Sequence, residues 1–183
     1  MNRLIDRRTL APVCASLILL LCTFNLSCSS NPCAPVFQAL EKLKGRTFHS
    51  FVSYDLSNSS QSIANSNEGI QIDGIAYWKD HGKWSIIDSD DRKFNSDRIK
   101  FATTISCRLE DTEFMDGEGA DHYVTHGTWK DDVNTDVHGQ FWVSRSTGLI
   151  LRSNFKFNAG GLVRGTASLR WEYANVSAPI VSR

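Results

Sequence analysis

The sequence has neither an excess of charge nor any of the short motifs that mark common enzyme and nucleotide sites. Its 20 basic and 20 acidic residues cancel to a formal net charge of zero. No basic stripe is visible, so nucleic acid is not an expected partner. No nucleophile elbow, HExxH, phosphate-binding loop or dinucleotide glycine pattern is present. No catalytic residue and no cofactor is therefore predicted, and the absence of CxxC argues against dithiol redox chemistry.

Long apolar runs are also scarce, and the longest lies near the N-terminus. Arg3, Arg7 and Arg8 precede an almost wholly apolar segment from Leu10 to Leu26. A basic start followed by such a run is typical of a secretory signal. The run is shorter than the roughly 20 apolar residues that a membrane-spanning helix needs. Residues 1–27 are therefore predicted to be a signal peptide, and a permanent membrane span is the weaker interpretation.

Cys28 follows this segment directly and is the predicted lipidation site. Leu26-Ser27-Cys28 resembles the lipobox of bacterial lipoproteins, in which the cysteine receives diacylglycerol, although Asn25 stands where that pattern has leucine. The alternative is that Cys28 has no role and belongs to a signal that is cut off, but an odd cysteine in an exported chain needs an explanation. We expect the protein on the periplasmic side of a bacterial envelope, held in a membrane by an N-terminal lipid anchor. Ser29 is compatible with the outer membrane.

Residues 28–46 are predicted to contain the anchor and one amphipathic helix over residues 32–44. Asn31-Pro32 is a typical helix start, and Gly45 is a typical stop. Apolar residues between them recur at i, i+3, i+4 and i+7, which is the spacing of one helical face. This stripe consists of Cys33, Val36, Phe37, Leu40 and Leu43.

Residues 47–183 are predicted to form an antiparallel β domain. Apolar and polar residues alternate in three segments, which are 99–109, 149–157 and 163–173. This period of two is typical of strands with one buried face. Weaker strands are predicted at 47–54, 69–78, 83–88, 120–129 and 138–144, and the polar stretch 57–67 is predicted to be a mobile loop. The predicted fold class is mainly β (α+β): a single curled antiparallel sheet or half-barrel of about eight strands, with the helix packed on its concave face.

Two cysteines of the predicted domain lie on apolar faces. Cys33 begins the helical stripe, and Cys107 lies on the apolar side of strand 99–109. If the helix packs on that side of the sheet, the two thiols meet. The alternative is two buried thiols that behave as small hydrophobic groups. In an oxidising compartment, a structural Cys33–Cys107 disulfide is favoured.

Three segments resemble hairpins of the LolA/LolB-like proteins, the bacterial periplasmic and outer-membrane lipoprotein carriers and their relatives. They are Gly74–Trp84, Phe141–Arg152 with its turn ending in Thr-Gly-Leu, and Leu169–Pro179. The resemblance implies an incomplete antiparallel barrel around a helix, with an apolar cavity between them. It also implies a hydrophobic ligand, either an acyl chain or a lipidated protein. Known carriers have several helices in the cavity, whereas this sequence predicts one.

The apolar stripes of the predicted strands supply the candidate ligand-binding residues. These are Phe101, Ile105, Leu151, Phe155, Leu169 and Trp171. The same residues suit an ordinary filled core, and the sequence does not separate the two readings. Two alternatives remain open: an envelope protein-binding or sensor module and a small enzyme on the same scaffold. The module would use a surface made of Arg152, Arg164, Arg170 and residues 130–136.

Histidines are the candidate metal ligands. His122 and His126 are four residues apart on one predicted strand, which places them too far apart to share a metal ion. His138, on a nearby strand, is able to join one of them. Solvent-facing histidines are nevertheless the favoured interpretation, and no metal site is predicted.

Overall fold

The structure, a computed structural model, describes residues 31–58, 60–87, 102–130 and 134–181. Apart from Asn31, these residues belong to one compact unit that spans Pro32–Arg183. Several predicted features lie outside the described residues. They are the signal peptide over 1–27, the lipidation site Cys28, Phe101, and residues 131–133 of the alternative protein-binding surface.

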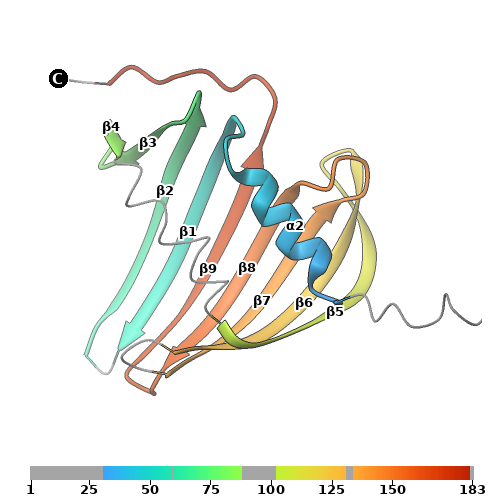
Figure 1. The fold of residues 1–183 in the computed structure, drawn as a ribbon. Coiled ribbons are helices and arrows are strands. Elements are labelled where there is room, and N and C mark those ends of the chain that lie inside the picture. The colour runs from blue at the N-terminus through green and yellow to red at the C-terminus, as the bar shows by residue number, and fades with distance from the viewer. Residues whose placement is uncertain (1–30, 59, 88–101, 131–133, 182–183) are drawn as a thin grey trace, which may run out of the picture. The chain divides into compact units, whose positions relative to one another are not determined.

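The described part of this unit consists of one helix and a single sheet of nine strands (Figure 1). The elements are α2 (Ala34–Leu43), β1 (Phe48–Asn58), β2 (Ser62–Ile72), β3 (Ile75–Asp80), β4 (Lys83–Ile87), β5 (Ala102–Met115), β6 (Glu118–Lys130), β7 (Asn134–Ser144), β8 (Ile150–Ala159) and β9 (Val163–Glu172). The strand order is β4-β3-β2-β1-β9-β8-β7-β6-β5, and neighbouring strands pair antiparallel. The last strand thus lies beside the first, and β4 and β5 are the two edges. Among the described residues these edges do not pair, so the sheet is curled but unclosed.

The sheet has nine strands rather than about eight because the predicted strand 69–78 is divided by a turn. Asp73 and Gly74 have φ angles of 49° and 79°, and they separate β2 from β3. Glycine adopts this left-handed conformation readily, and aspartate is among the few other residues that tolerate it. The Asp-Gly pair therefore makes the two-residue hairpin connection.

The prediction of a mobile loop over 57–67 is wrong, because most of this stretch belongs to β2. Strand β2 pairs with β1 continuously from Phe48↔Gln71 to Ser57↔Ser62. The connection is a tight turn, in which Asn58 Oδ1 accepts hydrogen bonds from the backbone N–H of Gln61 at 2.7 Å and of Ser60 at 2.9 Å. Both faces of β2 are exposed over 62–66. No apolar alternation is needed there, and the sequence pattern contains no strand signal.

Helix α2 begins at Ala34, two residues later than predicted, with Cys33 at the N-cap position. Pro35 in the first turn suits this start, because the first backbone N–H groups of a helix have no partner inside it. Gly45, at φ +71°, ends the helix as predicted. The helix packs on β7 and β8. We call the side of the sheet that contacts α2 the helix face, and the other side the opposite face.

Candidate functional site

The helix face carries the main apolar core. Val36 and Ala39 of α2 are fully buried against side chains of β6, β7 and β8. Those side chains are Tyr123, Phe141, Val143 and Ile150, with Leu40, Leu43, Phe155 and Trp171 packed around them. The ring of Phe155 meets the ring of Phe141 edge to face, with 5.3 Å between their centroids. This packing explains the helical stripe seen in the sequence.

A disulfide joins the start of α2 to the edge strand β5. Cys33 and Cys107 are bonded, with 5.1 Å between their Cα atoms. Cys33 is only 2% exposed, so the bond is part of the core. The predicted pairing is therefore present, and it fixes α2 on the helix face.

The residues predicted to line a ligand pocket do not form one cluster. Phe155 and Trp171 pack against the core beneath α2, and both are half-buried. Leu169, two residues from Trp171 on β9, shares its face and is half-buried. Ile105 is half-buried on β5, two residues before the disulfide-bonded Cys107. Leu151 instead belongs to a second buried cluster, with Trp142 and Ala120.

This second cluster lies on the opposite face of the sheet, on β6, β7 and β8. The imidazole of His122 stacks on the indole of Trp142, with 4.4 Å between centroids and 4° between planes. The guanidinium of Arg152 also lies over the Trp142 ring, 5.5 Å from its centroid. Tyr173 closes the cluster and donates its hydroxyl hydrogen to the carbonyl of Ile150. Burial raises the pKa of the Tyr173 hydroxyl, so this donor stays protonated.

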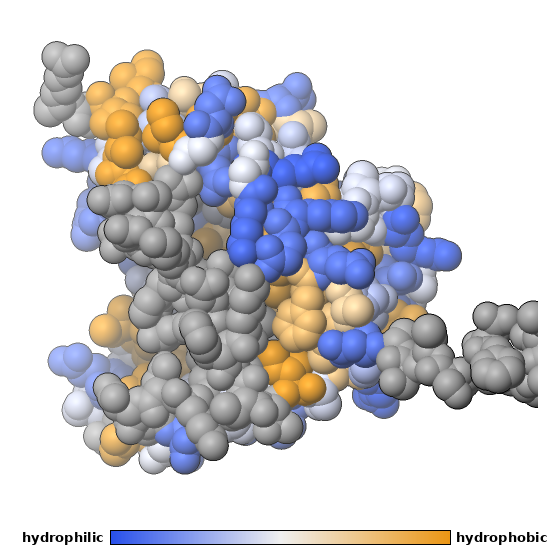
Figure 2. Space-filling model, viewed as in Figure 1, coloured by the Kyte–Doolittle hydropathy of each residue, from blue (hydrophilic) through white to orange (hydrophobic). Residues whose placement is uncertain are grey.

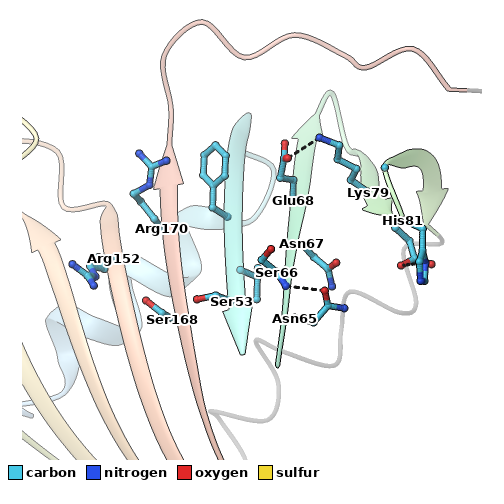
Figure 3. A pocket seen from close by; sticks show the side chains of 14 residues that line it. Ser53, Asn65, Ser66, Asn67, Glu68, Lys79, His81, Arg152, Ser168 and Arg170 are labelled. Carbon is cyan, nitrogen blue, oxygen red and sulfur yellow. Dashed lines mark hydrogen bonds and ion pairs between the residues drawn. The ribbon is translucent and has the colours of Figure 1, made fainter. Parts of the chain in front are cut away.

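A polar groove of about 620 Å³ lies on the opposite face, across β1, β2, β3, β8 and β9 (Figure 3). Its walls include Phe51, Ser53, Ser66, Glu68, Lys79, Arg152, Ser168 and Arg170. Figure 3 shows Arg152 and Arg170 on one side and Glu68 with Lys79 on the other. Arg170 lies over the ring of Phe51, 4.4 Å from its centroid, and also pairs with Glu172 at 2.6 Å. Arg152 and Arg170 are thus exposed cations on this face.

On the side of this groove away from the two arginines, Glu68 contacts two basic side chains. Its Oε1 atom accepts a hydrogen bond from Lys79 at 2.7 Å, and its Oε2 atom lies 3.3 Å from His49 Nε2. The Lys79 hydrogen bond is the main cause of a lowered pKa for the Glu68 carboxyl, with His49 adding to it. Glu68 is therefore ionised at neutral pH and balances Lys79.

A second groove of about 910 Å³ continues along the opposite face toward β7. Polar side chains such as Gln140, Asn154 and Lys156 line it together with apolar ones such as Val124 and Phe155. Neither of these two grooves includes Ile105, Leu151, Leu169 or Trp171. Of the described residues predicted to bind a ligand, Phe155 lines the second groove. The first groove therefore suits polar or charged groups, whereas the second also offers apolar contacts.

The histidines differ from the prediction of solvent-facing side chains. His122 is only 8% exposed, because Trp142 covers its ring, so that expectation is wrong for this residue. His126 and His138 are exposed, and they face each other as a register pair between β6 and β7. Asp136, which the sequence reading missed, bonds to both rings. The signal was available, because Asp136 and His138 are two residues apart and so share one strand face. The His126 hydrogen bond is the main reason that the pKa of Asp136 is lowered.

Comparison with known proteins gives likeness of fold only. No family model and no curated protein matches the sequence. LprF from Mycobacterium bovis is 11% identical with a TM-score of 0.46, and the match covers 83% of this chain and 97% of that one. A DUF1329 family protein from Desulfovibrio piger is 10% identical with a TM-score of 0.27, covering 81% and 96%. A domain described as a candidate outer membrane lipoprotein-sorting protein from Vibrio parahaemolyticus is 8% identical with a TM-score of 0.24, covering 77% and 94%.

All three TM-scores lie below 0.5, so these likenesses assign no function. Within the described residues, no helix is long and apolar enough to cross a membrane.

Proposed function

We propose that this chain is an exported, lipid-anchored protein of a bacterial envelope that binds a hydrophobic ligand on the helix face. The ligand class is an acyl chain or a lipidated protein, and Cys28 is the proposed anchor. The proposal places α2 on the concave side of the curled sheet, as a plug or lid over part of the binding surface. The signal-like N-terminal sequence supports export.

The observation that carries the proposal is that the apolar surface of the helix face extends beyond the strands that α2 covers. Helix α2 packs on β7 and β8, whereas apolar residues of the helix face continue onto β1 and β9. Val52 and Leu169 are register partners there, and Phe155 and Trp171 lie beside them; all four are only half-buried. Figure 2 shows hydrophilic side chains on the outer side of α2 and a small apolar area beside its lower part.

Binding would be driven by burial of apolar chain on this surface. Each buried methylene contributes about 0.8 kcal/mol, so ten methylenes are enough for strong retention of a fatty acyl chain. The half-buried aromatic residues Phe155 and Trp171 offer large apolar areas at small cost in side-chain entropy. No hydrogen-bond donor is required for the acyl part of such a ligand.

The first test is mass spectrometry of residues 29–183, which contain every described element, after expression in an oxidising compartment. Native spectra should show a lipid-sized adduct that is lost on denaturation. Leu169→Asn, on the helix face, should reduce the adduct strongly. Thr166→Asn, on the opposite face of the same strand, is the matched control and should retain it. A bare mass in native spectra, persisting after incubation with fatty acid, would overturn the proposal.

A protein-binding module is the second candidate, because exposed arginines gather on the opposite face. Arg152 and Arg170 are register partners that line the 620 Å³ groove, and Arg164 lies further along β9 on the same face. If this face is the working surface, changing Arg152 and Arg170 to Gln should abolish crosslinking to a partner in the envelope. The midpoint of thermal unfolding should stay nearly unchanged, because both side chains are exposed.

A further inference from the structure

A cluster of two histidines and one aspartate stands on the opposite face at the β6–β7 pair. His126 on β6 and His138 on β7 are direct register partners, and their rings stack with 4.4 Å between centroids and 10° between planes. Asp136 lies two residues before His138 on the same strand. Its Oδ1 atom is 2.7 Å from His126 Nε2, and its Oδ2 atom is 3.3 Å from His138 Nε2.

These three side chains bring together a set of donors suited to a transition metal. One ligand atom from each residue lies within 4.8 Å of the other two. Two imidazole nitrogens and one carboxylate oxygen are donors that Zn²⁺ commonly uses, with bonds of about 2.0–2.2 Å. Ligands on a tetrahedral ion at that bond length lie about 3.3 Å apart, so modest side-chain rotations bring all three into place.

The surroundings allow those rotations. The three side chains are between 48% and 59% exposed, so they move without disturbing the core. The strand pairing fixes their Cα positions, which keeps the ligands close together before the ion arrives. Lys156, the register partner of His138 on β8, is a nearby cation, and its exposed side chain has room to turn away. Three protein ligands leave one coordination position for water or another ligand.

We propose that His126, Asp136 and His138 bind a divalent transition metal ion, with Zn²⁺ as the probe ion, and that the ion clips β6 to β7. This site is separate from the apolar surface of the proposed function, since it lies on the other side of the sheet. The site uses the Nε2 atoms of both histidines and a carboxylate oxygen of Asp136. Bound metal would stabilise the folded chain, because the preassembled site exists only there.

A second group of potential ligands supplies a built-in comparison. His122 Nδ1 lies 3.0 Å from Asp111 Oδ1 and 3.4 Å from Glu113 Oε1. This histidine is held against Trp142 and offers a single imidazole with two carboxylates. His81 provides a second comparison: its Nδ1 atom lies 2.8 Å from Asp80 Oδ1, and its side chain is 90% exposed. Neither place brings two imidazoles together.

The test is titration of the full chain, purified from an oxidising compartment in mild detergent and stripped with EDTA, with Zn²⁺ by calorimetry. We expect one ion per chain and a rise in the midpoint of thermal unfolding on adding Zn²⁺. Loss of an outer-shell partner alone weakens metal binding about 10–100-fold, so His126→Gln and His138→Gln, which remove a ligand, should weaken it at least as much. His81→Gln and His122→Gln should bind like the wild type.

Unchanged Zn²⁺ binding in the His126→Gln, His138→Gln double variant would overturn the proposal, as would failure of the wild type to bind Zn²⁺ at micromolar concentrations. Loss of binding in His122→Gln alone would also overturn it and move the site to the Asp111–Glu113 group. Thermal unfolding without metal checks that each variant is folded. Retention of an acyl ligand is measured separately, so this outcome and that of the proposed function are independent.

Discussion

At the scale of single residues, small side chains decide how closely the strands and aromatic rings of the helix face approach each other. Gly139 on β7 is buried, and a Cβ added there would lie 2.4 Å from Thr125 Oγ1 and 3.2 Å from the Phe141 ring. Its missing side chain thus leaves room for the ring of Phe155, which is 3.4 Å from the same point. Glycine in a strand interior otherwise weakens the strand.

Gly139→Ala is therefore expected to destabilise the fold by about 1–3 kcal/mol, because the added methyl overpacks the core. Urea unfolding measures this loss of free energy. Gly119→Ala is the matched control on β6, where the nearest atom to an added Cβ is Arg145 Cδ at an ordinary 3.6 Å. The control should change stability by no more than about 0.5 kcal/mol. Equal stabilities for the two variants would contradict this account.

Glu68 predicts how stability depends on pH. Lys79 lowers the pKa of the Glu68 carboxyl below its usual 4.5. A lowered pKa in the folded state stabilises the fold fully above the unfolded pKa, and this contribution is lost as pH falls through the folded pKa. Both side chains are 32% exposed, so the contribution stays below about 1 kcal/mol.

Glu68→Gln should consequently flatten the loss of stability between about pH 5 and pH 3, relative to the wild type. Urea unfolding at a series of pH values provides the comparison. Lys79→Met removes the partner that lowers the pKa and should flatten the curve in the same way. Parallel curves for all three proteins would show that the Glu68–Lys79 pair makes no contribution to folding.

At the scale of elements, the position of α2 depends on two kinds of attachment. Its buried residues Val36 and Ala39 pack on β6, β7 and β8, and Cys33 bonds it to β5 at the edge of the sheet. Lys42 Nζ also donates a hydrogen bond to the Thr147 carbonyl, 2.9 Å away. A ten-residue helix is too short to be stable alone in water, so these contacts hold it in place.

Changing Cys33 and Cys107 together to Ser should lower the free energy of unfolding by about 4 kcal/mol, from the chain-entropy estimate for a loop of this length. The bond joins residues 74 positions apart. Reduction of the wild type with a thiol should give the same loss, measured by urea unfolding. Equal stability of the oxidised wild type and the double variant would mean that the packing of α2 alone is sufficient.

At the scale of the whole molecule, the sheet separates two kinds of surface. The helix face combines the buried core with apolar surface on β1, β8 and β9 that α2 leaves half-buried. The opposite face carries the two grooves, whose linings hold most of the exposed charges described above, and the His126–Asp136–His138 cluster. A ligand bound by burial of apolar chain and one bound by charge would therefore occupy different sides of the same sheet.

Much of this organisation followed from local patterns. Period-two alternation predicted strands that correspond to β5, β8 and β9, and the helical stripe predicted α2 to within two residues at its start. The apolar positions of Cys33 and Cys107 predicted their bond. The polar strand β2 was missed, because its pairing rests on backbone hydrogen bonds that any side chain permits.

The sequence by itself determined the helical stripe, the approximate ends of the helix and which cysteines are available to pair, because these depend on spacing along one segment. Only the tertiary structure decided the strand order, with β9 beside β1, and hence which side chains become neighbours. It brought His126 to His138, and Arg170 to Phe51, through inter-strand registers that no local period specifies. Periodicity assigns a side chain to a face, whereas its neighbours depend on contacts between strands far apart in the chain.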